Sequence, residues 1–271
     1  MNINDYIVRM GLDTAPPPTL EGLTAVHCAH LLSIPYENLD VQLGRPLTTA
    51  PAAAFDKLVT GRRGGWCYEM NGLLGWALGE MGFKVTRATG AVWREKMGDA
   101  SNGNHLVLRV ELPEGIWLAD AGFGDGPLDP IRIAQGPFAS HGFAYSLARL
   151  DADWWRLRDE RPGAKSFDFN LDAADENLLA EKCAFLQTAP ASPFVQNLVV
   201  QRHTPQGHAI LRGRTFSRVT PTGAVERQIA SADDLIATLR DVFTLDVPEV
   251  ASLWPRICAR HEEVLAQKRA T

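Results

Sequence analysis

The chain has 271 residues, of which 45% are hydrophobic and 22% are charged. This composition indicates a globular protein with a sizeable core, and it excludes a disordered chain, a collagen-like repeat and a minimal disulfide-held scaffold. The formal net charge is −5, so the chain as a whole has no bulk attraction for nucleic acid or for an anionic membrane surface.

Targeting and redox signals are weak. No apolar run approaches the ~20 residues of a membrane-spanning helix, and residues 1–13 lack the basic start and apolar stretch of a secretory signal. The four cysteines are widely spaced and form no CxxC pair, which argues against a zinc or dithiol site. We therefore expect a cytoplasmic protein with no metal, nucleic-acid or membrane partner, and we leave a homo-oligomer open.

Helical signals come first along the chain and strand signals follow. Apolar residues recur at helical spacing up to residue 83, and Pro51 stands where a first-turn proline belongs. The next segments read as strands joined by turns without intervening helices, which favours an antiparallel sheet or barrel. These predicted strands are residues 85–93, 105–112, 116–121, 145–150, 154–158 and 166–169.

The last third mixes both kinds of element. A helix is predicted over residues 172–187 and a proline-bearing hinge over 189–193. The remaining predictions are strands over 194–202 and 209–219, a helix from Ser231, and a C-terminal helix from Pro248 with a break at Pro255. The fold class is α+β, with a helical region over 1–83, a β region with a connecting helix over 84–188, and an α/β region over 189–271.

Cys67 differs from the other three cysteines in its surroundings. It follows Gly64 and Gly65 and directly precedes an apolar helical run, so it lies at a helix N-terminus. Backbone N–H groups and the helix dipole stabilise a thiolate there. The alternative is a small buried hydrophobic residue, which we assign to Cys28, Cys183 and Cys258 because they lie in helical segments.

A nucleophilic thiolate needs a base, and the base needs an orienting group. His105 begins one predicted strand and Asp120 ends the next. Neighbouring antiparallel strands bring these two ends together, so His105 and Asp120 should be adjacent in space. The sequence thus predicts a Cys67, His105 and Asp120 triad; we expect surface or core roles for the other histidines, with His141 left open.

Five short elements carry a resemblance to one enzyme family, the arylamine N-acetyltransferases. Residues 63–71 (RGGWCYEMN) resemble the family's RGGxCxExN signature, and residues 34–39 (IPYENL) resemble its IPFENL element, with Tyr36 for Phe. Residues 104–105 (NH), 120–124 (DAGFG) and 192–197 (SPFVQN) match three further elements in the family's order, with Ala121 where Val is common. The resemblance covers nearly the whole chain.

The resemblance implies a helical bundle carrying the nucleophile, an antiparallel β-barrel and an α/β lid, with a core like that of cysteine proteases and transglutaminases. It implies acetyl transfer from acetyl-CoA to the nitrogen of an arylamine or arylhydrazine by a ping-pong mechanism through an acetyl-Cys67 thioester. Because the chain has neither GxGxxG nor a Walker loop, coenzyme A would bind in a cleft specific to the family.

Two further sets of residues follow from these elements. Tyr36, Phe123 and Phe194 are candidates for an aromatic wall at the substrate, with core packing as the alternative, and the loop at Gly103 and Asn104 is a candidate for oxyanion and substrate contacts.

Within the elements that support the nucleophile loop, Arg63 and Glu37 are expected to form a structural ion pair. The competing functions are a cysteine hydrolase or transglutaminase-like amidase, since the triad does not decide whether water or an amine resolves the acyl-enzyme, and a binding module without catalysis.

Overall fold

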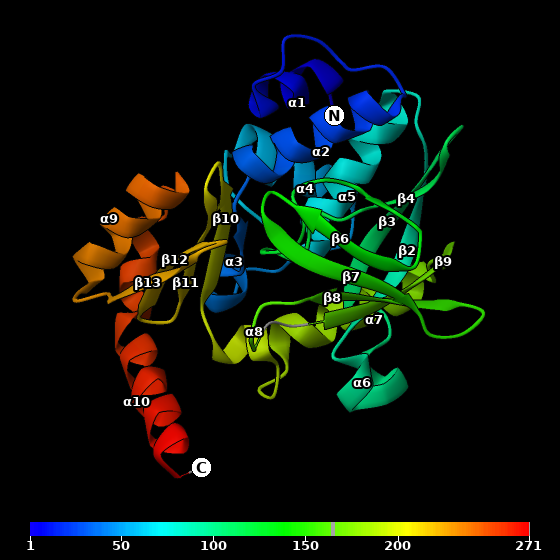
Figure 1. Cartoon of the computed structure of the whole chain (residues 1–271). Helices are drawn as coiled ribbons and strands as arrows, with labels where there is room; N and C mark the ends of the chain where they lie inside the picture. The colour runs from blue at the N-terminus through cyan, green and yellow to red at the C-terminus, as the bar shows by residue number, and fades with distance from the viewer. Residues whose placement is uncertain (164–165, 271) are drawn as a thin grey trace.

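The computed structural model of the chain describes residues 1–163 and 166–270. Helices gather near both ends of the chain, and two antiparallel sheets lie between them (Figure 1). The helices are α1 (Ile3–Met10), α2 (Leu20–Ser33), α3 (Leu39–Gln42), α4 (Pro51–Phe55), η1 (Asp56–Thr60), α5 (Cys67–Glu80), α6 (Arg94–Met97), η2 (Gly98–Ser101), α7 (Glu176–Thr188), α8 (Pro193–Gln196), α9 (Ala232–Phe243), η3 (Pro248–Leu253) and α10 (Trp254–Ala270).

The strands range in length from two residues in β1 and β5 to nine in β2. They are β1 (Tyr36–Glu37), β2 (Lys84–Val92), β3 (His105–Leu112), β4 (Gly115–Ala119), β5 (Ile131–Arg132), β6 (Gly136–Ser140), β7 (Phe143–Arg149), β8 (Trp154–Asp159), β9 (Ser166–Ala173), β10 (Val199–Thr204), β11 (Gly207–Arg212), β12 (Thr215–Thr220) and β13 (Gly223–Gln228).

Helix α5 is the centre of the N-terminal region. It is buried on nearly every side, and it packs against α4 and against strands β2 and β3. Gly75 allows this close approach, because a Cβ atom there would lie 2.9 Å from the Leu108 side chain on β3. The apolar run after Cys67 is therefore a core helix, and burial of its side chains by the hydrophobic effect fixes where Cys67 lies.

The larger sheet has the strand order β5-β4-β3-β2-β9-β8-β7-β6 in the described part of the chain, with every pair antiparallel. Only residues 133–135 join its two edge strands, β5 and β6, so the sheet curls until its edges approach each other. An irregularity between Ala88 and Gly90 on β2 shifts the register against β9 and increases the local bend. The predicted α+β class with an antiparallel barrel-like sheet is confirmed.

The smaller sheet has the order β1-β10-β11-β12-β13 in the described residues. One of its faces packs against α9, η3 and the start of α10 around a separate apolar core. Strand β1 comes from the N-terminal region and pairs with β10 through Tyr36↔Gln201 and Glu37↔Val200. A strand from the first predicted region therefore belongs to the sheet of the third. The division of the chain at residues 83 and 188 stays a prediction.

Three predicted elements of the last third differ from the structure. Residues 194–202 were predicted as one strand, but Ser192 caps and Pro193 begins the short helix α8, so the strand starts at Val199. The predicted strand 209–219 is a hairpin of β11 and β12 that turns at Gly213, where φ is +56°. Pro255 does not break a helix, because α10 begins at Trp254 and a first-turn proline is compatible with helix.

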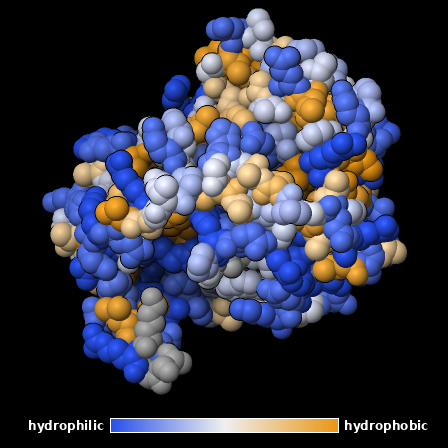
Figure 2. Space-filling model, viewed as in Figure 1, coloured by the Kyte–Doolittle hydropathy of each residue, from blue (hydrophilic) through white to orange (hydrophobic). Residues whose placement is uncertain are grey.

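Few large apolar side chains are exposed in the part of the chain that the structure describes. Figure 2 shows hydrophilic residues over most of one face, with orange residues scattered among them. The large exposed apolar residues belong to different elements; they are Met1, Val8, Met97, Ile116, Leu150, Phe185 and Val225. None of the helices in residues 1–163 and 166–270 is both long enough and apolar enough to cross a membrane.

Candidate active site

The loop before Cys67 is held against β1 by backbone pairing. Gly65 donates its N–H to the Pro35 carbonyl at 3.2 Å and accepts the Glu37 N–H at 2.9 Å. Gly64 lies so close to this segment that a Cβ atom there would be 2.3 Å from the Pro35 carbonyl oxygen. A glycine is therefore required where the loop enters α5, and Cys67 is the first residue of that helix.

Cys67 is almost fully buried, with 2% of its surface exposed. Burial raises the pKa of its thiol above the ordinary value, whereas hydrogen bonding from the backbone N–H groups of Leu106 and Tyr68 lowers it. The position at the start of α5 predicted a lowered pKa, and burial outweighs that effect for the isolated thiol. A thiolate at this position requires a compensating positive charge.

His105 and Asp120 lie together as predicted from the strand order. His105 is the first residue of β3, and Asp120 follows the last residue of β4, which pairs with β3 from Leu112↔Gly115 to Leu108↔Ala119. His105 Nε2 and Asp120 Oδ2 are 2.8 Å apart, and both side chains are buried.

The Asp120 carboxylate is held through both of its oxygens. Oδ2 contacts His105, while Oδ1 accepts the Asn71 Nδ2 amide at 2.7 Å and the Gly122 N–H at 2.8 Å. Burial raises the pKa of Asp120, but His105 and these hydrogen bonds more than offset it, and the net pKa is below the ordinary value. Asp120 is therefore a stable carboxylate beside the imidazole ring.

Cys67 contacts Gly122 and Asn104, which are close in sequence to Asp120 and His105. A Cβ atom at Gly122 would lie 2.7 Å from Cys67 Cα and 2.9 Å from Cys67 Cβ, so the segment that follows Asp120 rests directly on the nucleophile residue. Cys67 Sγ also lies 3.9 Å from the carbonyl oxygen of Asn104, the residue before His105. The structure thus brings the three predicted triad residues into one buried site.

Two residues of this site were not assigned to it from the sequence: Asn71 had no stated role, and His27 was expected to be a surface or core residue. Asn71 lies one turn along α5 from Cys67; its side chain also donates to the Leu106 carbonyl at 2.5 Å and accepts the Ala121 N–H at 2.8 Å. His27 accepts the Asp120 N–H on Nε2 at 3.1 Å and contacts the Leu128 carbonyl through Nδ1 at 2.8 Å. The Asn71 position in the signature could have suggested its role, whereas His27 comes from a distant helix and gave no local signal.

The predicted aromatic residues surround the site from different elements. The ring of Phe123 lies 5.9 Å from that of His105, and Phe194 lies 5.3 Å from Trp66, the residue before Cys67. Tyr36 is buried in the same apolar cluster as Cys67. The ring of Phe167 on β9 lies closer to that of His105 than the ring of Phe123 does, at 4.9 Å. The sequence did not indicate this contact, because it depends on the pairing of strands that are far apart in the chain.

The loop at Gly103 and Asn104 has its backbone N–H groups engaged. Gly103 donates to the Gly90 carbonyl and Asn104 to the Ser101 carbonyl, both at 3.0 Å. The Asn104 side chain pairs with both backbone groups of Val92, at 2.7 and 3.1 Å. In this conformation neither amide is available to an oxyanion, and the two residues instead hold the start of β3 in position.

Arg63 and Glu37 form the expected ion pair, with Nη2 and Oε1 2.8 Å apart. The pair is part of a larger buried network, in which Asp40 contacts both Arg63 and Lys57, and Lys57 contacts Glu69 at 2.9 Å. Glu69 Oε2 also accepts the Trp66 N–H at 3.3 Å. This network connects β1 and the loop to the first turn of α5; Lys57 was not singled out from the sequence.

Comparisons with known proteins show which family this chain resembles. A family model described as N-acetyltransferase matches residues 19–251. The chain is 36% identical to an arylamine N-acetyltransferase of Mycolicibacterium smegmatis over 98% of both chains. It is 31% identical to a Salmonella typhimurium protein named arylamine N-acetyltransferase and N-hydroxyarylamine O-acetyltransferase, over 92% of this chain and 90% of the other.

Solved structures of similar proteins have the same fold. The M. smegmatis arylamine N-acetyltransferase structure superposes with a TM-score of 0.86 at 34% identity, covering 95% of this chain and 97% of the other. A Mycobacterium marinum arylamine N-acetyltransferase structure in complex with CoA gives a TM-score of 0.85 at 30% identity, with 96% and 98% covered.

Proposed function

The chain belongs to the arylamine N-acetyltransferase family, and from this premise we propose that Cys67, His105 and Asp120 transfer an acetyl group from acetyl-CoA to the nitrogen of an arylamine or arylhydrazine. The single observation that carries the residue assignment is the 2.8 Å contact between His105 and Asp120 in the site that also contains Cys67. Relatives named as transferases favour transfer over the hydrolase alternative.

Activation of the thiol requires proton transfer to His105. A lone thiolate is disfavoured at this buried position, but moving the proton from Cys67 to the imidazole creates two opposite charges and leaves the net charge of the site unchanged. Asp120 accepts from Nε2, so Nδ1 is the ring nitrogen that exchanges the proton. The carboxylate stabilises the imidazolium, and the N–H groups of Leu106 and Tyr68 stabilise the thiolate.

The first half-reaction forms the acetyl-enzyme. Cys67 Sγ attacks the carbonyl carbon of acetyl-CoA, and the bond between that carbon and the coenzyme A sulfur breaks. The departing sulfur takes the proton from the His105 imidazolium, which returns the ring to its neutral form.

The second half-reaction uses an amine. Its nitrogen attacks the acetyl carbon of the Cys67 thioester while His105 accepts the proton that the nitrogen loses, and Cys67 leaves as a thiolate. Phe123 and Phe194, both half-buried beside the site, and Tyr36 are proposed to contact an aryl group. Arg63 and Glu37 are proposed to support the nucleophile loop and not to touch the substrate.

Intact mass after incubation with acetyl-CoA alone tests the proposal. The wild-type chain should gain one acetyl group, located on Cys67 by peptide mapping, and should lose it when an arylamine is added. Cys67→Ala should gain none, and Cys183→Ala, which changes another buried cysteine, should behave like the wild type. An unmodified wild-type chain, or an acetyl group on another residue that an amine does not discharge, would disprove the assignment.

We propose the cytoplasm as the location because all four cysteines are free thiols, which suits a reducing compartment. Fractionation of cells that express the native chain tests this location. The expected partners are coenzyme A and a small aromatic amine or hydrazine.

A further inference from the structure

A second group of chemically reactive side chains lies outside the triad. Cys28 on α2, Asp129 before β5 and His141 in the turn between β6 and β7 each place one potential ligand atom within 4.8 Å of the other two. Asp129 Oδ1 lies 3.8 Å from Cys28 Sγ and 3.5 Å from His141 Nε2. Helix α2 and two segments that follow it by about 100 residues or more thus converge on one point. These three side chains have no place in the mechanism above.

We propose that Cys28, Asp129 and His141 form a binding site for a divalent transition metal ion of the zinc class. A thiolate, an imidazole and a carboxylate are the three side-chain types that Zn²⁺ prefers, and zinc bond lengths of about 2.0–2.3 Å with tetrahedral angles place neighbouring ligand atoms roughly 3.3–3.6 Å apart. The two separations from Asp129 Oδ1 come within a few tenths of an ångström of that range. Three protein ligands leave the fourth position to water.

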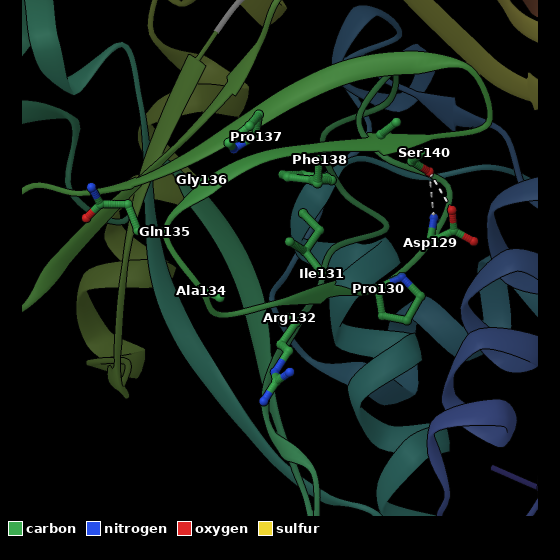
Figure 3. Close-up of a pocket in the computed structure, with 11 residues that line it drawn as sticks. Asp129, Pro130, Ile131, Arg132, Ala134, Gln135, Gly136, Pro137, Phe138 and Ser140 are labelled. Carbon is green, nitrogen blue, oxygen red and sulfur yellow. Dashed lines mark hydrogen bonds between the residues drawn. The ribbon is translucent and has the colours of Figure 1, made fainter.

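The carboxylate is oriented by its neighbours. Ser140 Oγ donates to Asp129 Oδ2 at 2.7 Å and accepts the N–H groups of Leu128 and Asp129 at 3.1 and 3.2 Å, as the dashed lines between Ser140 and Asp129 in Figure 3 partly show. Oδ1 is thereby left to face Cys28 and His141. Metal sites commonly fix a ligating carboxylate by such a hydrogen bond to its second oxygen.

An ion can reach this group from solvent. The side chains of His141 and Asp129 are 48% and 39% exposed, and Cys28 is half-buried. Asp129 also lines one end of a hollow of about 310 Å³, whose other lining residues are 130–132 and 134–140 (Figure 3). The backbone of His141 lies in the left-handed region, with φ +47°, which few residues other than glycine adopt.

The three ligands connect helix α2 to the segment that leads from the triad. Leu128, the neighbour of Asp129, contacts His27, the neighbour of Cys28, and His27 in turn accepts the Asp120 N–H. A bound ion would therefore cross-link α2, the end of this segment and the β6–β7 turn. Because an ion that binds only the folded chain stabilises it, thermal stability should rise with metal concentration.

Equilibrium dialysis against Zn²⁺, and spectroscopy of the Co²⁺-loaded chain without acetyl-CoA, test the site. Cys67→Ala serves as the background, because the triad thiol is itself a metal-binding group. We expect one equivalent of ion, a thiolate-to-cobalt charge-transfer band and a higher melting temperature.

Matched variants in that background assign the ligands. Cys28→Ala and His141→Ala should each remove the bound equivalent, and Cys28→Ala should also remove the charge-transfer band. Ser140→Ala should weaken binding by about 10- to 100-fold. Cys258→Ala, which removes a half-buried cysteine on α10, should bind like the background.

Two results would overturn the proposal. One is the absence of saturable binding in the background; the other is unchanged binding in either Cys28→Ala or His141→Ala. His141 is on an exposed turn, so its variant should fold even if the helix variant does not. None of these measurements involves acetyl transfer, so their outcome is independent of the triad assignment.

Discussion

Replacing Gly122 by Ala would test how tightly the nucleophile is positioned. The added Cβ would lie 2.7 Å from Cys67 Cα, 2.9 Å from Cys67 Cβ and 2.7 Å from Asn71 Nδ2. The closest carbon contact falls about 0.8 Å short of the ~3.5 Å at which nonbonded carbons ordinarily meet. The atom that it meets is part of the backbone of α5 and has no rotamer through which to move away.

A displacement of that size has a predictable effect on the chemistry. A misplacement of about 1 Å between reacting groups can lower a rate by roughly 100-fold, and overpacking a core typically costs about 1–3 kcal/mol of folding stability. We therefore expect Gly122→Ala to fold with a lower melting temperature and to form the acetyl-enzyme about 100-fold more slowly. Rapid-quench mass spectrometry after mixing with acetyl-CoA measures that rate.

Gly126→Ala is the matched control in the same segment. Gly126 is also buried, but a Cβ atom there would lie 3.5 Å from Phe123 Cβ, which is an ordinary contact, so we expect a rate close to that of the wild type. A Gly122→Ala variant with the wild-type rate and the wild-type melting temperature would refute the argument, because it would show that this contact does not constrain Cys67.

Four further predictions concern the thiol, its partners and a buried histidine. Cys67→Ala should abolish amine-dependent release of coenzyme A thiol while Cys258→Ala retains it; the opposite pattern would remove Cys67 from the nucleophile role. Iodoacetamide at pH 6 should label Cys67 in the wild type but not in His105→Ala, because burial alone raises the pKa of the thiol once the imidazolium is gone; equal labelling in both proteins would contradict the ion pair. Asp120→Asn should fold, shift the midpoint of Cys67 alkylation to higher pH and slow acetyl-enzyme formation by up to ~10⁴-fold; an unshifted midpoint would place the orienting carboxylate elsewhere. Burial lowers the pKa of His30 to about 3, so as the pH falls below about 6.5 the unfolded chain takes up a proton that the folded chain does not. His30→Gln should therefore reduce the acid-side dependence of the unfolding free energy on pH by up to ~1.4 kcal/mol per pH unit. Urea titrations between pH 7 and 4 measure this dependence, and the same dependence in variant and wild type would exclude the contribution of His30.

The triad residues could be predicted because each has a local signal. Cys67 follows two glycines and begins an apolar helix, and a short hairpin fixes the relation of His105 to Asp120 through the pairing of β3 with β4. These signals depend on neighbouring residues or on one turn, and both are readable from the sequence. The burial of Cys67, which opposes thiolate formation, depends on the packing of several distant elements and is not readable in the same way.

The remaining differences have physical causes of the same kind. Strand β13 is exposed at every position and has no apolar alternation, so its only signal is the turn that precedes it. The segment 193–196 includes residue types that favour strands, but the Ser192 cap and the first-turn Pro193 favour a helix, and the segment is helical. The contacts of His27 and Phe167 with the site join elements that are far apart in sequence, which no periodicity encodes.

The two-residue strand β1 has a consequence for modularity. Its backbone pairs with β10 on one side, and the same segment pairs with Gly65 in the nucleophile loop on the other. The C-terminal sheet therefore cannot be exchanged between relatives as an independent cassette. A graft from another chain must present a β10 edge that pairs in register with Tyr36 and Glu37. Otherwise β1 loses its pairing, and the loop that leads to Cys67 loses the strand that it pairs with.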